Sequence, residues 1–89
     1  MIRSEVIISN RLGLHARAAA RFVQVASRFR ARVTVGRAGR SMDGKSILGI
    51  LLLAAGQGTH LEILVDGEDE VEAMANLTAL VQSGFGESL

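Results

Sequence analysis

The sequence lacks several residue types on which common functions depend. It has no cysteine, no proline, no tryptophan and no tyrosine, and phenylalanine, which occurs three times, is its only aromatic residue. Without cysteine the chain can form neither a disulfide nor a thiolate centre, which fits a reducing compartment. Its few aromatic side chains offer no platform on which nucleic-acid bases could stack. The longest mainly apolar run, residues 47–55, is far shorter than the ~20 residues that cross a bilayer.

The length and composition suit one small folded unit. The chain has 89 residues, of which 48% are hydrophobic and 21% are charged. This is enough apolar material for one core but not for two, so we expect a single domain over residues 1–89. The beginning, MIRSEVII, lacks the apolar run of a signal peptide. We therefore expect a cytoplasmic protein without direct membrane insertion.

The charges are unevenly distributed along the chain. Residues 1–45 hold all ten basic side chains and two acids, whereas residues 46–89 hold seven acids and no Lys or Arg. The two halves thus carry formal charges of +8 and −7, within a net charge of +1. If the halves stay apart in space, one end of the molecule is basic and attracts anionic partners. Otherwise the charges form an ordinary solvated surface.

Hydrophobic periodicity predicts four strands and three helices. Between residues 16 and 28, apolar residues recur at intervals of three and four, which predicts a first helix. A last helix is predicted over 70–83, with a core stripe of Val71, Met74, Leu77 and Val81. Alternation and glycine turns predict strands over 4–8, 31–35, 40–42 and 59–65, and a further helix covers 47–54. The order is β-α-β-β-α-β-α. It favours an α+β fold, in which helices cover one face of a mostly antiparallel four-stranded sheet.

His15 is the strongest candidate for chemistry. It lies just before the first turn of the helix over 16–28, where unpaired backbone N–H groups favour an anion. Arg17 adds positive charge, and the small residues Gly13, Ala16 and Ala18 leave room for a ligand or partner. A neutral imidazole there can act as a nucleophile, and the same groups would neutralise a phosphoryl group bound to it. The other interpretation is an ordinary polar histidine.

Self-contained catalysis is not expected. His15 and His60 are the only histidines, and no metal-binding motif or serine–histidine–acid arrangement can be placed. We therefore expect no metal and no cofactor, and a carrier that depends on other proteins rather than a stand-alone enzyme.

The helix over 47–54 offers a surface for such proteins. Ser46 precedes it and is predicted to cap it. Apolar residues surround nearly the whole helix. Because a short surface helix cannot bury every face, we expect some of these residues to be exposed and to form a partner site. The alternative is that all of them belong to the core. The candidate docking residues are Ile47, Leu48 and Leu51, extended from the first helix by Ala20, Arg21 and Gln24.

Three stretches carry a resemblance to a known family. LGLHARAAARF, MDGKSILGILLLAAGQGT and VDGEDE resemble the HPr/NPr family of histidine-containing phosphocarriers of the bacterial phosphoenolpyruvate-dependent phosphotransferase system, and the likeness covers nearly the whole chain. It implies an open-faced sandwich with strand order 1-4-2-3. It also implies that His15 accepts phosphate on Nδ1 from phosphorylated enzyme I and passes it to a histidine of a IIA protein. Arg17 and the backbone amides of Ala16 and Arg17 would hold that phosphate.

The resemblance also implies a regulatory site and shows two departures. Ser46 matches the serine that HPr kinase/phosphorylase modifies in many bacteria, and Ile47, Leu48 and Leu51 match docking positions. The family usually has proline where this chain has Ala18, and some members carry a polar residue at the position of Leu12. Because alanine also favours helix, we expect transfer to survive. We expect a monomer.

Alternative functions follow from the same residues. The first is a carrier of the nitrogen-related branch, NPr, rather than of sugar uptake. The second is a nucleic-acid-binding module, suggested by nine arginines in the basic half, although no nucleic acid is our expected partner. The third is a small-molecule-sensing domain, which would bind a metabolite tightly and carry no labile phosphate.

Overall fold

The computed structural model describes residues 1–87 and confirms the predicted order of elements. Buried and exposed side chains alternate along the strands, because one face of the sheet is packed and the other is open. The elements are β1 (Ile2–Ile7), α1 (Ala16–Ala26), β2 (Arg32–Arg37), β3 (Arg40–Asp43), α2 (Ile47–Leu52), β4 (His60–Asp66), α3 (Glu70–Gln82) and a 3-10 turn, η1 (Gly84–Gly86).

The four strands form one antiparallel sheet in the order β1-β4-β2-β3. In the register of this sheet Val6 lies opposite Leu61, and Val35 lies opposite Ile63. All four of these side chains are buried, so the register places the apolar side chains of neighbouring strands on the same face. The α+β fold class and the strand order are both as expected.

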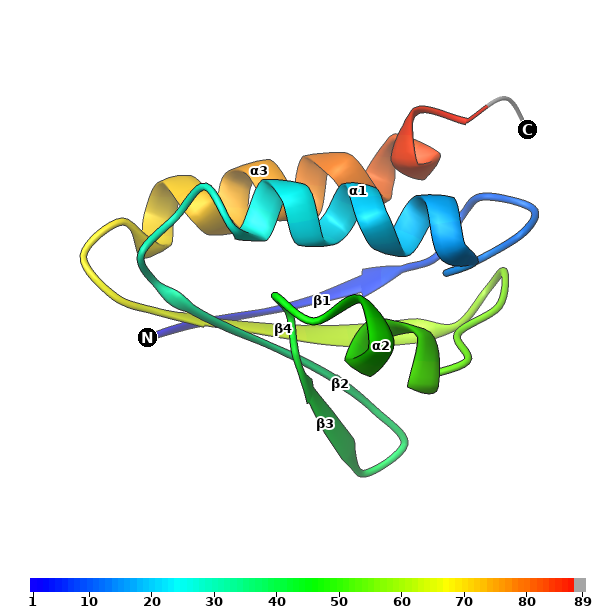
Figure 1. The fold of residues 1–89 in the computed structure, drawn as a ribbon, viewed down its shortest axis with the longest axis horizontal. Coiled ribbons are helices and arrows are strands. Elements are labelled where there is room, and N and C mark those ends of the chain that lie inside the picture. The colour runs from blue at the N-terminus through cyan, green and yellow to red at the C-terminus, as the bar shows by residue number, and fades with distance from the viewer. Residues whose placement is uncertain (88–89) are drawn as a thin grey trace.

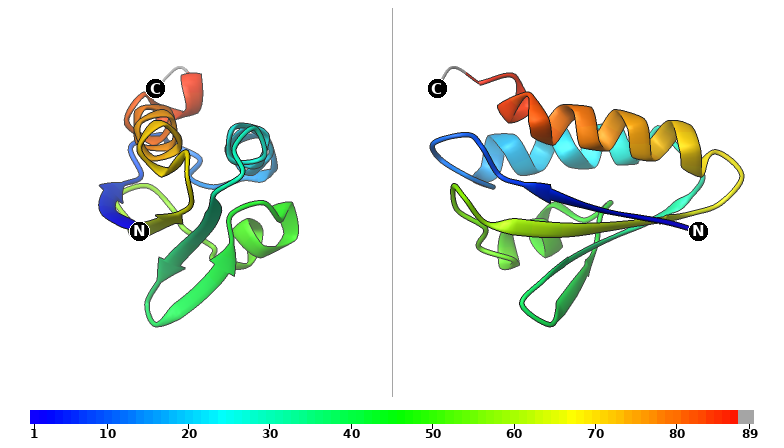
Figure 2. Two further views of the ribbon diagram at one scale, coloured as in Figure 1. Left: turned by 90° about the vertical axis from the view of Figure 1, so that its left-hand side faces the viewer. Right: turned by 180° about the vertical axis from the view of Figure 1, so that it is seen from behind.

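All three helices cover the same face of the sheet (Figures 1 and 2). On α1 the spacing of Ala19, Phe22, Val23 and Ala26 predicts one buried face. Ala19, Phe22 and Ala26 are buried, together with Ala18, whereas Val23 is only partly buried. α1 and α3 run in opposite directions, so the start of α1 lies at the same end of the molecule as the end of α3 (Figure 1). The acidic start of α3 lies at the other end.

Some details of the helices differ from the prediction. Val71 was expected in the core stripe of α3, but its side chain is 72% exposed. Each helical residue turns by about 100°, and Val71 consequently points away from the direction shared by Ala73, Leu77 and Val81, which are buried. The middle helix also ends at Leu52 rather than at 54, and Ala54 has a positive φ of 50°. α1 and α3 end at Ala26 and Gln82, slightly before their predicted ends.

Within residues 1–87 no helix is both long and apolar enough to cross a membrane.

Candidate functional site

His15 is the N-cap residue of α1 and has extended backbone angles, with φ −72° and ψ 176°. Its carbonyl oxygen accepts the first helical hydrogen bond, from the N–H of Ala19 at 2.9 Å. Its side chain makes no capping hydrogen bond. The imidazole therefore lies at the start of the helix, and neither of its nitrogens is used to cap the helix.

The loop before His15 is fixed by specific contacts. The N–H of Leu14 donates to the carbonyl oxygen of Ala55 at 2.9 Å, and the Leu14 side chain is buried. Gly13 has a φ of 66°, in the left-handed region that favours glycine. The loop is thus tied to the segment between α2 and β4, so the backbone that carries His15 has a defined position.

The first turn of α1 supplies hydrogen-bond donors. The N–H groups of residues 16–18 have no acceptor inside the helix, because an α-helix leaves its first donors unpaired. Ala18, at the position for which the resemblance implies a proline, is buried, and the helix begins at Ala16. Alanine at this position is therefore compatible with the same helix start.

Three arginines gather near this helix end. Arg11, Arg17 and Arg21 line a hollow of about 510 Å³ together with Leu12, Gly86 and Glu87. We call it the arginine hollow. Arg17 is exposed, whereas Arg21 is half-buried and donates from Nη1 to the carbonyl oxygen of Phe85. Leu12 is 68% exposed and lines the hollow with an apolar side chain.

Two residues of the site were missed by the sequence reasoning. Glu87 places Oε2 2.5 Å from Nε2 of His15, and its Oε1 accepts a 2.9 Å hydrogen bond from Nδ2 of Asn10. The hydrogen bond from Asn10 is the main cause that holds the pKa of Glu87 below its usual range; the contacts with His15 and Arg21 act in the same direction, and burial opposes them. The only sequence signal was an acid after a GFG turn near the end of an acidic half.

Ser46 has the predicted capping role. It is the N-cap residue of α2, and its Oγ accepts a 3.1 Å hydrogen bond from the N–H of Gly49. The interpretation of Ser46 as a cap is therefore confirmed.

The predicted docking residues lie on two neighbouring helices, since α2 packs against α1. Ile47 and Leu48 are 45% and 68% exposed, whereas Leu51 is half-buried and Ile50 is fully buried. Leu52, which the prediction did not include, is also exposed. On α1, Ala20 and Arg21 are half-buried and Gln24 is exposed. The apolar residues of α2 are thus divided between the core, where Ile50 lies, and an exposed cluster of Ile47, Leu48 and Leu52.

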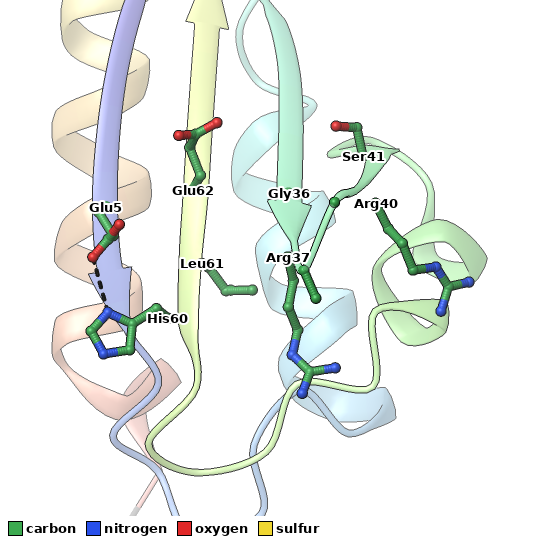
Figure 3. Close-up of a pocket in the computed structure, with 10 residues that line it drawn as sticks. Glu5, Gly36, Arg37, Arg40, Ser41, His60, Leu61 and Glu62 are labelled. Atoms are coloured by element: carbon green, nitrogen blue, oxygen red, sulfur yellow. Dashed lines mark hydrogen bonds and ion pairs between the residues drawn. The ribbon is translucent and has the colours of Figure 1, made fainter.

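The second histidine lies elsewhere, on the open face of the sheet. Nδ1 of His60 is 2.9 Å from Oε1 of Glu5, beside a hollow of about 370 Å³ near the β2–β3 turn (Figure 3). Both side chains are more than half exposed, and the helices lie behind the sheet in this view. His60, at the beginning of β4, is therefore not placed at the start of a helix as His15 is. Among residues 1–87 no group of three His, Asp or Glu side chains is arranged to hold a metal ion.

Comparison with known proteins gives consistent matches. The family described as PTS HPr component phosphorylation site matches residues 2–83. The phosphocarrier protein HPr of Xylella fastidiosa is 47% identical over 87 residues, which cover 98% of each chain, and that of Pseudomonas aeruginosa is 51% identical over 84 residues, 93% of each. The crystal structure of HPr-C-His from Thermoanaerobacter tengcongensis superposes over 100% of both chains, with a TM-score of 0.96 and 42% identity.

These matches do not favour the nucleic-acid-binding or metabolite-sensing alternatives. The family match covers His15, its loop and α1 as well as Ser46 and α2, so it includes every element of the site except η1 and Glu87. The chain therefore belongs to the HPr family and is a phosphocarrier protein of the bacterial phosphotransferase system.

Proposed function

We propose that His15 is the residue on which this phosphocarrier holds its phosphoryl group, bound to Nδ1. The observation that carries the proposal is the position of His15 at the N-cap of α1 with its ring unused for capping. Phosphorylated enzyme I supplies the group, and a histidine of a IIA protein accepts it.

Arg17 and the first turn of α1 neutralise the phosphoryl charge in this proposal. The N–H groups of Ala16 and Arg17 lie next to His15 in the chain, and Arg17 lines the arginine hollow. A charge at a helix end gains ~0.3–1 kcal/mol, and up to ~2 kcal/mol when it is partly buried. Such modest stabilisation suits a carrier, since a group held too tightly could not be passed on.

The exposed apolar cluster on α2 is the proposed docking surface for both partners. Ile47 and Leu48 are large exposed side chains, which occur where a surface binds another protein. Leu51 completes the apolar part, and Ala20, Arg21 and Gln24 extend it along α1, where Arg21 adds a positive charge suited to an acidic partner.

Ser46 is the proposed site of regulation by a kinase of the HPr kinase/phosphorylase type. A phosphate there would remain compatible with the helix start, because α2 presents free N–H groups to it. It would also add a charge of about −1.5 to −2 beside Ile47 and Leu48 and repel an acidic partner. Phosphorylation of Ser46 therefore inhibits transfer without unfolding the protein.

The remaining aspects of the proposal concern its setting. The protein acts in the cytoplasm as a monomer and a single domain, either in sugar uptake or in a regulatory branch of the system. The nitrogen-branch alternative is not favoured by relatives that carry the name HPr. Rates of transfer to purified IIA proteins of the two branches would separate these settings.

A labelling experiment tests the central proposal. The protein is mixed with enzyme I and labelled phosphoenolpyruvate, and we expect one phosphate that is labile in acid and stable in alkali. His15→Ala should take up no label, while His60→Ala, which changes the histidine on the open face, should label normally. Arg17→Ala should label about 10–100-fold more slowly, because a hydrogen bond to a charged group contributes ~1.5–3 kcal/mol. Arg28→Ala, an exposed arginine beyond α1, is its control. Normal labelling of His15→Ala would contradict the proposal.

A further inference from the structure

The segment after α3 returns to the start of α1 and brings a carboxylate to His15. η1 lies at the end of the molecule where α1 begins (Figures 1 and 2), and it contacts α1. There Oε2 of Glu87 is 2.5 Å from Nε2 of His15, across 72 positions of sequence. The side chains of His15 and Glu87 are only 26% and 12% exposed. This is a partly buried contact rather than a chance pairing of surface charges.

Glu87 is held in place from both directions. Just before it, the side chain of Phe85 is 1% exposed within the core, and its carbonyl oxygen accepts a hydrogen bond from Arg21. At its side chain, Oε1 of Glu87 accepts a hydrogen bond from Nδ2 of Asn10 at 2.9 Å. Both carboxylate oxygens of Glu87 are thus engaged, one by the His15 ring and one by the loop that precedes His15.

Asn10 is placed to donate to Glu87. It is fully buried, and Nδ2 donates both to Glu87 and to the carbonyl oxygen of Gly13, at 2.8 Å. Turning the amide over would set Oδ1 against two acceptors, so the hydrogen-bond network fixes its orientation. Its Oδ1 is buried and finds no partner among residues 1–87, which costs free energy. A buried amide with only its donors satisfied is consistent with a role in supporting Gly13 and Glu87.

The charge state of Glu87 determines which nitrogen of His15 carries the proton. The hydrogen bond from Asn10 favours the charged carboxylate, and a carboxylate can only accept hydrogen bonds. Nε2 of His15 must therefore donate, and in a neutral imidazole the other nitrogen, Nδ1, then holds a free lone pair.

We propose that Glu87 is a positioning residue for phosphoryl transfer, which acts by holding His15 in the tautomer protonated at Nε2 and by balancing the positive charge of the phosphorylated ring. This inference rests on the proposed role of His15 as the phosphoryl acceptor. Asn10 supports Glu87 from the other side, so the three residues form one chain of hydrogen bonds from a buried amide to the reacting ring.

The transfer step balances with this arrangement. The lone pair of Nδ1 forms a bond to phosphorus, while the bond between phosphorus and its donor atom breaks and that electron pair leaves with the donor. The proton on Nε2 stays where it is, so the ring gains a positive charge that faces the Glu87 carboxylate. Onward transfer reverses these changes: the bond between Nδ1 and phosphorus breaks, and its electron pair returns to Nδ1.

Glu87→Gln tests this role with a nearly isosteric side chain that lacks the charge. Nitrogen-15 NMR of the unphosphorylated protein measures the tautomer of His15, and labelling by enzyme I and phosphoenolpyruvate measures the rate. We expect the wild type to hold the proton on Nε2, and Glu87→Gln to show a mixture of tautomers and label at least tenfold more slowly, as is typical when a residue that orients a ligating or reacting histidine is changed. Glu72→Gln, an exposed acid on α3, is the matched control.

A second variant and the His15 control separate the possible failures. Asn10→Ala removes the support of Glu87 and should move the tautomer in the same direction; a thermal melt of each variant checks folding. An unchanged tautomer or an unchanged labelling rate in folded Glu87→Gln overturns the inference, even if His15→Ala takes up no label. If His15→Ala is labelled normally, the proposed acceptor itself is wrong, whatever Glu87→Gln does.

Discussion

The α-carbon of Gly13 lies against the carbonyl oxygen of Ala55, so closely that a β-carbon on residue 13 would come within 2.4 Å of that oxygen. Gly13 also has a φ of 66°. The next residue continues the contact, since the N–H of Leu14 donates to the same carbonyl oxygen. The loop that carries His15 is thus packed backbone to backbone against the segment before β4, and glycine is required at its centre.

Gly13→Ala should therefore lower the free energy of unfolding by about 2–5 kcal/mol. The left-handed backbone angle and the clash with Ala55 both penalise a β-carbon at this position. Chemical denaturation measures the loss. The control is Gly56→Ala, where a β-carbon would meet nothing within 4 Å. A Gly13→Ala protein as stable as the control would show that the loop can move away from Ala55, and that the backbone of His15 is not fixed by this contact.

Ser46 offers a test that separates capping from charge. Ser46→Ala should lose about 0.5–2 kcal/mol of stability, because the N–H of Gly49 loses its acceptor. Ser46→Asp should keep the cap and melt close to the wild type, yet accept phosphate from enzyme I more slowly, because its charge lies beside Ile47 and Leu48. Ser41→Asp, which adds the same charge at an exposed site in β3, is the control. Equal transfer rates for the two aspartate variants would argue against an effect at the docking surface.

Periodicity predicted the core well, because the core is a local consequence of helix and strand geometry. Phe22 and Ala26 follow helical spacing, and Leu61, Ile63 and Val65 alternate in β4, so each face could be assigned from neighbouring residues. The error at the start of α3 has the same origin. Val71 is three residues before Met74, a spacing that suits the edge of an apolar stripe. In the structure, however, Val71 lies outside the face that α3 packs against the sheet and α1.

The candidate site was predicted only in part. His15 and Ser46 could be recognised because each stands directly before a helix, which is a local pattern. The contact between His15 and Glu87 spans 72 positions and depends on where α3 ends, how η1 turns and where Phe85 is buried. None of these features has a periodic signature. The charge asymmetry gave no sign of it either, since Glu87 belongs to the acidic half but lines the arginine hollow.

The start of α3 provides a prediction of pH dependence. Asp69 accepts hydrogen bonds from the N–H groups of Arg30 and Ala31, at 2.8 and 2.9 Å. The hydrogen bond from Arg30 is the largest cause that lowers the pKa of Asp69 from its ordinary value of 3.8, followed among the lowering causes by that from Ala31. Because the pKa is lower in the folded state, the charged carboxylate stabilises the fold above pH 3.8, and this contribution disappears as the pH falls through the folded pKa.

Asp69→Asn should accordingly be less stable than the wild type at pH 7, and the difference should shrink as the pH is lowered below about 4. Urea denaturation at several pH values measures it. Glu68→Gln is the control, since Glu68 is exposed and its side chain makes no hydrogen bond within residues 1–87. A difference that stayed constant between pH 7 and pH 3 would mean that Asp69 acts through its shape rather than its charge.

Leu48 tests whether the exposed cluster on α2 binds enzyme I. Leu48 and Val71 are similarly exposed, at 68% and 72%, but Leu48 lies on α2 beside α1, whereas Val71 lies in the first turn of α3, which begins at the other end of the molecule from His15. Leu48→Asp should raise the KM of enzyme I for this protein about tenfold or more, because losing one anchor of an interface costs at least ~1.4 kcal/mol. Val71→Asp is the control: it also replaces an apolar side chain of similar exposure with an acidic one, and it should leave the KM unchanged. Both variants should melt near the wild-type temperature, since neither side chain is part of the core. Equal KM values for the two variants would place the docking surface elsewhere on the molecule.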